Sequence, residues 1–374
     1  MKRIFLLLTI TTVLLIALFS FGSYAVTTGS NISARSVVLY CSDNSEFVFE
    51  KDADTAVPMA SLTKVMTALV VLDRSDPQSV VEIPSEACGI EGSSVYLTAG
   101  EKLTVGDLLY ALMLESANDA AVALALSVSD SVSDFAELMN RKAEELSLTS
   151  THFTNPHGLD DEDHYSSARD LALLFDYALR NEDFAKIVST YKYSIPYGDD
   201  PDGRSLVNHN RLLNSCEGCI GGKTGYTKRT GRCLVSACRR KDITLICVTL
   251  NDTDDWADHR DMFDYGFSIL DRYTLVNEGT FVGMHLISGT SDTVRGKIST
   301  FEAVLTKDQY NSLNPVYRLK RFYYAPVNNG DVLGSLVWYC EDKMIGSCEI
   351  TSIETIESIK YKRSFWSRLF SFLN

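Results

Sequence analysis

The sequence lacks an excess of positive charge. Its 374 residues include 35 Lys and Arg against 49 Asp and Glu, which gives a formal net charge of -14. Nucleic-acid binding needs clustered Lys and Arg against the phosphates, so we exclude nucleic acid as a partner. Internal repeats are missing, and so are low-complexity segments outside the two ends. The hydrophobic content of 45% is that of a folded globular protein, and the length suits two domains or one large domain with an appendage.

Cysteine is too scarce to build a disulfide framework. The chain has nine cysteines, an odd count that leaves at least one unpaired within a monomer. Cys216 and Cys219 have C-x-x-C spacing, but neither a second pair nor a His cluster accompanies them, which argues against zinc. A small loop disulfide and two free thiols are both open for this pair. We expect neither a metal nor a cofactor.

The N-terminus has the pattern of a secretory signal. Met1-Lys2-Arg3 is followed by an uncharged apolar run over residues 4–21, and Ser23-Tyr24-Ala25 then has small residues at the positions that a signal peptidase reads. The sequence therefore predicts a signal peptide over residues 1–25. The apolar run is somewhat long, so an uncleaved signal anchor is the alternative. Either segment would place the rest of the chain outside the cytoplasm, and we expect it at the outer face of the cytoplasmic membrane.

The C-terminus has the pattern of an amphipathic helix. Large apolar residues recur at helical spacing and cations lie among and before them. The apolar residues are Phe365, Trp366, Leu369, Phe370, Phe372 and Leu373, and the cations are Lys360, Lys362, Arg363 and Arg368. We expect residues 354–374 to form a helix that is too short to span a membrane but binds its surface. A helix that packs on its own protein is the alternative.

Hydrophobic periodicity divides the rest of the chain into three parts. Two short strands are expected over residues 36–40 and 46–50, and then helices over 61–72, 104–114, 118–128, 134–146 and 168–180. Strands over 232–238 and 243–250 and a helix over 256–270 follow. This order predicts an α+β fold with helices against an antiparallel sheet over residues 26–272. Short alternating runs over 273–353 predict a separate, small all-β domain.

Three short motifs carry the chemistry. They are Ser61-Leu62-Thr63-Lys64, Ser116-Ala117-Asn118 and Lys223-Thr224-Gly225, in this order. Each motif alone is weak evidence for an active site, because such short patterns also occur by chance. Ser189 and Lys192 make a second S-x-x-K, the decoy motif. Structural readings exist for each of them, since a Ser often caps a helix, a Lys is usually solvated, and Lys-Thr-Gly is often a turn. The three motifs together, each in a suitable context, favour a serine acyl-enzyme.

The first motif supplies the nucleophile and its base. Ser61 opens an apolar helix, and Lys64 lies one turn later on the same face, so its amine can take the proton of the Ser61 hydroxyl. Only a neutral amine can do this. Burial in the apolar helix and the positive charge of Lys223 are both expected to lower the pKa of Lys64.

The other motifs are expected to handle the proton and the substrate. Ser116 would relay the proton to the leaving group and Asn118 would hold the substrate amide. Lys223 and Thr224 would bind a terminal carboxylate from an edge strand. After Gly225, the Tyr226 N–H would join the N–H of the serine helix in an oxyanion hole.

These residues resemble the D-alanyl-D-alanine carboxypeptidases among the low-molecular-mass penicillin-binding proteins. The resemblance covers about residues 38–270 and is dense over 57–70, 98–125, 155–174 and 221–237. It implies a penicillin-binding/β-lactamase-like transpeptidase domain, followed by a small β domain and a C-terminal amphipathic anchor. The implied activity is removal of the last D-alanine from peptidoglycan stem pentapeptides through an acyl-Ser61 intermediate. β-Lactams would acylate the same serine as covalent inhibitors.

The resemblance also raises questions at three positions. Arg211 falls where relatives can carry an arginine that lines the site, with a surface role as the alternative. Some relatives place an arginine after the strand that corresponds to 245–250, whereas this chain has the acidic segment 251–255 there. The groups that bind the substrate carboxylate can therefore differ in this protein. His157 matches a family position, and we expect it to support a loop and not to take part in catalysis.

Three rival functions stay open at this point. A β-lactamase has the same three motifs, but Ala117 stands where its second motif usually has Asp, and no evident E-x-x-x-N loop follows. A DD-endopeptidase, which cleaves D-alanyl cross-links, is not distinguished by the sequence. A non-catalytic wall-associated scaffold is disfavoured because all motif side chains are intact.

Overall fold

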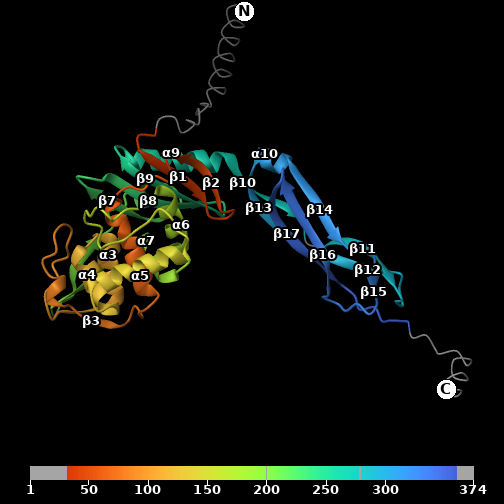
Figure 1. Cartoon of the computed structure of the whole chain (residues 1–374), viewed down its shortest axis with the longest axis horizontal. Coiled ribbons are helices and arrows are strands. Elements are labelled where there is room, and N and C mark those ends of the chain that lie inside the picture. The colour runs from red at the N-terminus through yellow and green to blue at the C-terminus, as the bar shows by residue number, and fades with distance from the viewer. Residues whose placement is uncertain (1–31, 199, 278, 360–374) are drawn as a thin grey trace, which may run out of the picture.

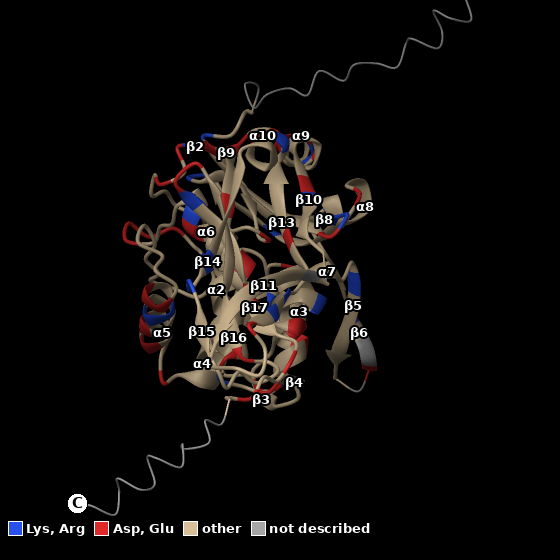
Figure 2. Ribbon diagram, turned by 90° about the vertical axis from the view of Figure 1, so that its right-hand side faces the viewer, with Lys and Arg blue, Asp and Glu red and all other residues tan. Residues whose placement is uncertain are grey.

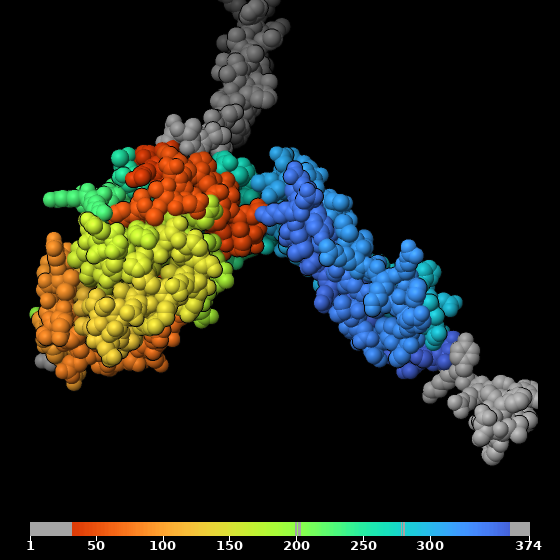
Figure 3. Space-filling view, viewed as in Figure 1, coloured from red at the N-terminus to blue at the C-terminus, as the bar shows by residue number. Residues whose placement is uncertain are grey.

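The computed structural model describes residues 32–198, 200–277 and 279–359. Figure 1 shows a part with helices packed against a sheet and a second part built from strands, and Figure 3 shows them as two lobes. The predicted signal peptide and most of the predicted C-terminal helix lie outside the described residues. Residues 354–359 are described and are not helical, since Ile356 and Ser358 form isolated β-bridges with Val327 and Gly289. Among the described residues, no helix is long and apolar enough to cross a membrane.

The first part is built on a five-stranded antiparallel sheet with the order β2-β1-β9-β8-β7. Its strands are β1 (Ser36–Cys41), β2 (Glu46–Lys51), β7 (Cys219–Thr227), β8 (Gly231–Arg240) and β9 (Ile243–Asp252). The predicted hairpin at the N-terminal end and the predicted strand pair around residues 239–242 are both confirmed. Strand β7 forms one edge of the sheet, so one side of its backbone is open to a ligand.

Helices cover both faces of this sheet. They are α2 (Lys64–Leu72), α3 (Val105–Leu114), α4 (Asn118–Val128), α5 (Val132–Glu145), α6 (Ala168–Leu179), α7 (Glu182–Ser189), α8 (Leu212–Ser215) and α9 (Asp255–Ile269). The larger core lies between one face of the sheet and the six helices α2, α3, α4, α5, α6 and α7. Val235 and Val248 are examples of the sheet residues in it. The smaller core joins α8 and α9 with the opposite face, through residues such as Leu234 and Phe263. The α+β prediction is confirmed.

Local sequence signals explain where the helices begin. Thr104 caps α3 in a reciprocal pair with Asp107, and Ser131 caps α5 through the Asp134 N–H. The residue pattern of α5 explains why this helix lies on the surface. Its apolar residues, such as Phe135 and Met139, are buried, whereas acidic and basic residues alternate along its outer face (Figure 2).

Further short strands surround these elements. Strands β3 (Val80–Glu82) and β4 (Lys102–Thr104) pair below α3 and α4, and β5 (Lys192–Tyr197) pairs with β6 (Asp200–Val207). Neither pair is predicted from the sequence, and neither is α7. The predicted helix over 61–72 also needs a correction, because residues Ala60–Thr63 form a 3-10 turn, η1, and α2 begins only at Lys64. A second 3-10 turn, η2, spans Ser85–Ala87.

The second part consists almost entirely of strands. They are β10 (Leu270–Val276), β11 (Thr280–Ile287), β12 (Thr293–Ile298), β13 (Phe301–Thr306), β14 (Leu313–Leu319), β15 (Tyr323–Tyr324), β16 (Val332–Cys340) and β17 (Lys343–Ser352), with one short helix, α10 (Lys307–Asn311). Six of them form the sheet β14-β16-β17-β12-β11-β15, and β10 pairs with β13. Trp338 stacks on Phe301 at 4.8 Å beside the apolar core of this part. Strand β10 follows α9 directly, so the expected boundary after residue 272 falls within β10.

Candidate active site

Ser61 lies on a turn whose backbone is held in an unusual conformation. Ala60, the residue before it, has a φ of +49°, a region that residues with a side chain rarely occupy. Gly158 packs against this turn so closely that an added Cβ would lie 2.0 Å from the Ala60 carbonyl oxygen. The turn has no side-chain cap, so the Ser61 hydroxyl does not cap the helix as an N-terminal Ser often does. The hydroxyl is instead free to face Lys64.

The Lys64 amine has three neighbours that match the needs of a neutral base. Its Nζ lies 3.0 Å from Ser61 Oγ, 2.7 Å from Asn118 Oδ1 and 2.5 Å from the His157 carbonyl oxygen. The amide and carbonyl oxygens can only accept hydrogen bonds, whereas the hydroxyl can donate one. A neutral amine has two N–H groups and one lone pair. Two N–H groups can therefore go to the two carbonyl-type oxygens, and the lone pair can face the hydroxyl of the nucleophile.

The electrostatics favour this neutral form. Lys64 is 0% exposed, and burial holds its pKa well below the ordinary value, helped by the positive charge of Lys223. Asp119 opposes both effects but does not cancel them. Lys223 is 1% exposed, and burial lowers its own pKa to about 7. Both causes that the sequence suggests for Lys64 are present in the structure.

The edge strand β7 runs directly beside the Ser61 turn. At Gly225, an added Cβ would lie 3.2 Å from the Ser61 backbone nitrogen and 3.1 Å from the Met59 carbonyl oxygen. Only a residue without a side chain lets the two backbones come this close without a shift. The strand thereby brings the backbone of Tyr226 next to the turn of the nucleophile, as an oxyanion hole with two N–H donors requires.

The second motif, Ser116-Ala117-Asn118, lies at the beginning of helix α4. Ser116 precedes α4 and has a φ of +59°, so its backbone is also in the left-handed region. Asn118 is the first residue of α4 and is nearly fully buried. Its Oδ1 accepts from Lys64, and its Nδ2 donates to the Glu91 carbonyl at 2.5 Å. This bond uses one of the two N–H groups of Nδ2, so the second would be the one to hold a substrate amide.

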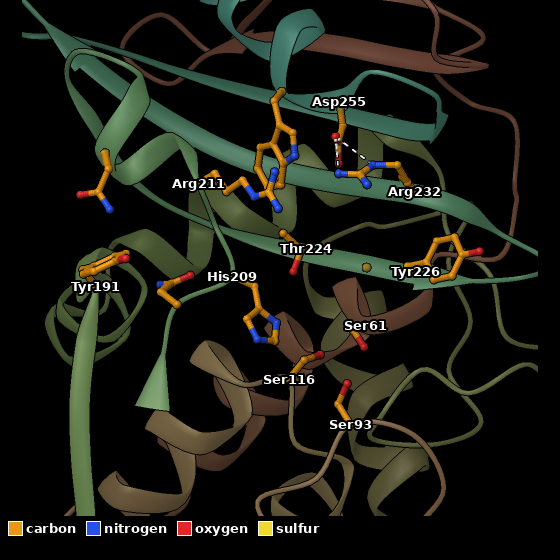
Figure 4. Close-up of a pocket in the computed structure, with 14 residues that line it drawn as sticks. Ser61, Ser93, Ser116, Tyr191, His209, Arg211, Thr224, Tyr226, Arg232 and Asp255 are labelled. Carbon is orange, nitrogen blue, oxygen red and sulfur yellow. Dashed lines mark hydrogen bonds and ion pairs between the residues drawn. The ribbon is translucent and has the colours of Figure 1, made fainter. Parts of the chain in front are cut away.

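A cavity of about 670 Å³ opens over these groups (Figure 4). Its walls contain the predicted residues Ser61, Ser116, Arg211, Thr224, Gly225 and Tyr226. In Figure 4, Thr224 lies between Ser61 and the upper wall, and the Ser61 and Ser116 side chains face the lower part of the cavity. The other predicted residues, Lys64, Asn118 and Lys223, are buried behind the wall. From there Lys64 contacts Ser61, and Lys223 donates to the Thr224 carbonyl.

Several residues of the cavity have no counterpart in the sequence-based predictions. Arg232, Asp255 and Trp256 form its upper wall, and Ser93, Tyr191, Asn208, His209 and Asn214 complete it. Arg232 was not predicted from the sequence, because this residue stands outside the three motifs. Its partner Asp255 belongs to the acidic segment 251–255, which indicated that the carboxylate site lacks the arginine of some relatives. The His157 backbone carbonyl was also missed, although the expected loop role of this residue agrees with its position beside Lys64.

The decoy motif does not form a site. Ser189 ends α7 and donates to the Lys186 carbonyl, whereas Lys192 begins β5 and is exposed. Within the part of the chain that the structure describes, no group of His, Cys, Asp and Glu side chains could hold a metal ion. All nine cysteines are free thiols, and the Sγ of Cys216 lies 3.6 Å from that of Cys238.

Comparisons with known proteins agree with this geometry. A family model described as D-alanyl-D-alanine carboxypeptidase, Peptidase_S11, matches residues 24–254. The chain is 30% identical to the D-alanyl-D-alanine carboxypeptidase DacF of Bacillus subtilis, over 87% of this chain and 86% of that protein. Its structure is similar to penicillin-binding protein 5 of Haemophilus influenzae, with a TM-score of 0.71, 26% identity, and coverage of 87% of this chain and 98% of that one. It is also similar to the Streptomyces K15 DD-transpeptidase, with a TM-score of 0.61, 33% identity, and coverage of 64% and 98%.

Proposed function

Because this chain belongs to the D-alanyl-D-alanine carboxypeptidase family, we propose that Ser61 carries the acyl group when the enzyme removes the terminal D-alanine of peptidoglycan pentapeptides. The single observation that supports this role best is the 3.0 Å distance between Ser61 Oγ and the Nζ of the fully buried Lys64. The enzyme is a serine hydrolase that β-lactams inhibit by acylation.

The proposed reaction has two steps. Ser61 Oγ attacks the carbonyl carbon of the penultimate D-alanine while Lys64 takes its proton. The C–N bond to the terminal D-alanine then breaks, and Ser116 passes the proton from Lys64 to the departing nitrogen. Water hydrolyses the ester in the second step and restores the Ser61 hydroxyl. The N–H groups of Ser61 and Tyr226 stabilise the negative oxygen in both steps.

The remaining predicted residues would hold the substrate. Asn118 would bind the backbone amide of the stem peptide, and Gly225 lets the peptide lie along the open side of β7. Lys223 and Thr224 are on the side of the terminal carboxylate. Arg211 lies at the start of α8 and lines the same cavity, which supports a role in binding.

The test is Ser61→Ala, with Ser189→Ala as a matched control from the decoy motif. We expect Ser61→Ala to abolish both D-alanine release from a pentapeptide and labelling by a fluorescent penicillin, whereas Ser189→Ala keeps both. Unchanged release by Ser61→Ala would move the nucleophile elsewhere. Persistent labelling of the wild-type enzyme supports a carboxypeptidase, and rapid turnover of the label would favour a β-lactamase.

We further propose that the protein is exported and works at the outer face of the cytoplasmic membrane. The basic and apolar N-terminus supports export through a signal peptide over residues 1–25, and the aromatic and basic residues of 354–374 support attachment to the membrane surface. In this proposal residues 26–272 are catalytic, and the β domain, 273–353, joins them to the anchor. Truncation of the mature enzyme before Lys360 should release it from membranes with unchanged turnover. Membrane retention of the truncated enzyme would contradict the anchor.

A further inference from the structure

We propose that Arg232 binds the terminal carboxylate of the substrate and that Asp255 positions it for this task. The inference rests on the proposed function, because it concerns the same cavity and the same substrate. It adds a cation to the carboxylate site that none of the three motifs contains.

The register of the sheet places Arg232 beside Thr224. Thr224 pairs with Leu234 across β7 and β8, and Arg232 stands two residues before Leu234 on the same strand. Side chains two residues apart on a strand point to the same face, so Arg232 is the diagonal neighbour of Thr224. Diagonal neighbours lie roughly 7–8 Å apart at the backbone, a separation that a long side chain bridges. In Figure 4, the Arg232–Asp255 pair lies above Thr224, on the side away from Ser116.

Asp255 holds the guanidinium in place but leaves part of it free. Arg232 Nη2 lies 2.8 Å and its Nε lies 3.0 Å from the same oxygen, Asp255 Oδ1. The guanidinium has five N–H groups, and these two bonds use two of them. Both residues line the cavity, but the Arg232 side chain is 44% exposed and that of Asp255 only 5%, so the cation is the more accessible member of the pair. The Trp256 ring, 5.8 Å from the guanidinium carbon, lies beside the same group.

The two carboxylates beside Arg232 each have a second stabilising interaction. Asp255 is the first residue of α9, which continues to Ile269, and the positive end of a helix dipole stabilises a negative charge at this position. Asp252, which stands opposite Arg232 on β9, is engaged by the Ser33 hydroxyl at 2.6 Å and is nearly fully buried.

The other cations of the region are less suited to this role. Lys223 is buried behind the wall, donates to the Thr224 carbonyl at 2.9 Å, and is not fully charged at neutral pH because burial lowers its pKa to about 7. Arg211 lines the cavity but comes from the start of the four-residue helix α8, and among the residues that the structure describes no carboxylate pairs with it as Asp255 does with Arg232. A guanidinium that is always charged and already held in position loses little conformational entropy when it binds a carboxylate.

The experiment compares two substrates in one set of variants. One is a diacylated L-Lys-D-Ala-D-Ala peptide with a free carboxylate, and the other is the same peptide with a C-terminal amide. We expect Arg232→Gln to lower kcat/KM for the carboxylate peptide by roughly 100-fold and for the amide by less than about threefold, since only the former loses a charged hydrogen bond. Arg232→Lys should lose less, because it keeps the charge. Asp255→Asn should weaken the preference for the carboxylate in the same direction.

Arg229→Gln is the matched control, because Arg229 is an exposed arginine in the turn between β7 and β8 and does not line the cavity. It should leave both substrates unchanged. Equal losses on both substrates by Arg232→Gln would show a merely structural ion pair and overturn the inference. Collapse of the preference in Arg211→Gln alone would also overturn it. If the wild-type enzyme cleaves the D-Ala-D-Ala bond of neither peptide, so that neither D-alanine nor D-alanine amide is released, the proposed function fails instead.

Discussion

The replacement Lys64→Arg tests the central chemical step. Arginine keeps a positive charge and several N–H groups, so it can still donate to Asn118 Oδ1 and to the His157 carbonyl. It cannot offer a lone pair to the Ser61 hydroxyl, because a guanidinium is not deprotonated in proteins. The variant thus removes the base while it keeps hydrogen-bond donors at the same place.

The size of the effect follows from the site. Lys64 is the amine 3.0 Å from Ser61 Oγ, and Lys223, the other amine in the region, donates to the Thr224 carbonyl. A positioned general base contributes about 10²–10⁴ to a rate. We therefore expect acylation to slow about 10³-fold, which corresponds to about 4 kcal/mol at about 1.4 kcal/mol for each factor of ten. The larger guanidinium in a fully buried position should also lower the melting temperature, because a buried cluster leaves little space for extra atoms.

The assay is the rate of acylation by a fluorescent penicillin at neutral pH, with the melting temperature measured in parallel to show that the variant is folded. Lys192→Arg is the control, because Lys192 occupies the same position in the decoy motif and is exposed. Lys64→Met serves as a second variant that has neither a charge nor a basic nitrogen, and it should be equally slow. An acylation rate of Lys64→Arg within roughly tenfold of the wild type would refute the role of Lys64 as base.

Two further predictions concern charge and thiols. Acylation needs neutral Lys64, so the acylation rate should rise with pH through the pKa of Lys64. Lys223→Met removes a positive charge that lowers this pKa, so the rise should move to higher pH. An unchanged pH profile in Lys223→Met would exclude the coupling between the two lysines. Treatment with oxidised glutathione should join Cys216 to Cys238, because their Sγ atoms lie 3.6 Å apart and the Cys238 thiol and Arg240 lower the pKa of Cys216 to about 7. Peptide mapping would contradict this if it found a Cys216–Cys219 link, while Cys340→Ser should leave the product unchanged.

Residue patterns were sufficient for the parts of the fold that depend on local forces. The helix over 118–128 and the strands around residues 239–242 were predicted within one to two residues, because each has a continuous apolar period and a clear start or turn. Helix α7 and the hairpin β5–β6 were missed. Both are short, which leaves little periodicity to detect. The apolar residues of α7 pack into the larger core, and the Asn208 side chain donates to the Val188 and Thr190 carbonyls between α7 and β5.

The first motif shows where local reasoning ends. Its spacing predicts that Lys64 can reach Ser61, since residues three apart share a helical face. The 3-10 turn before α2, the positive φ of Ala60 and the close packing of Gly158 are not visible in that spacing, because they are imposed by a loop about 100 positions away in the chain.

The sequence by itself determined the fold class, the order of the motifs and the pairing of the nucleophile with its base, because these follow from periodicity and from spacing within one turn of helix. Tertiary structure alone decided which groups face the cavity and which lie behind it. It brings Arg232 next to Thr224 through strand register, and it brings Asp255 to Arg232 from 23 positions further along. In a sequence, an arginine and a separate acidic segment are usually interpreted as surface charge. Only the packing of α9 against β8 brings Arg232 and Asp255 together in one wall of the cavity.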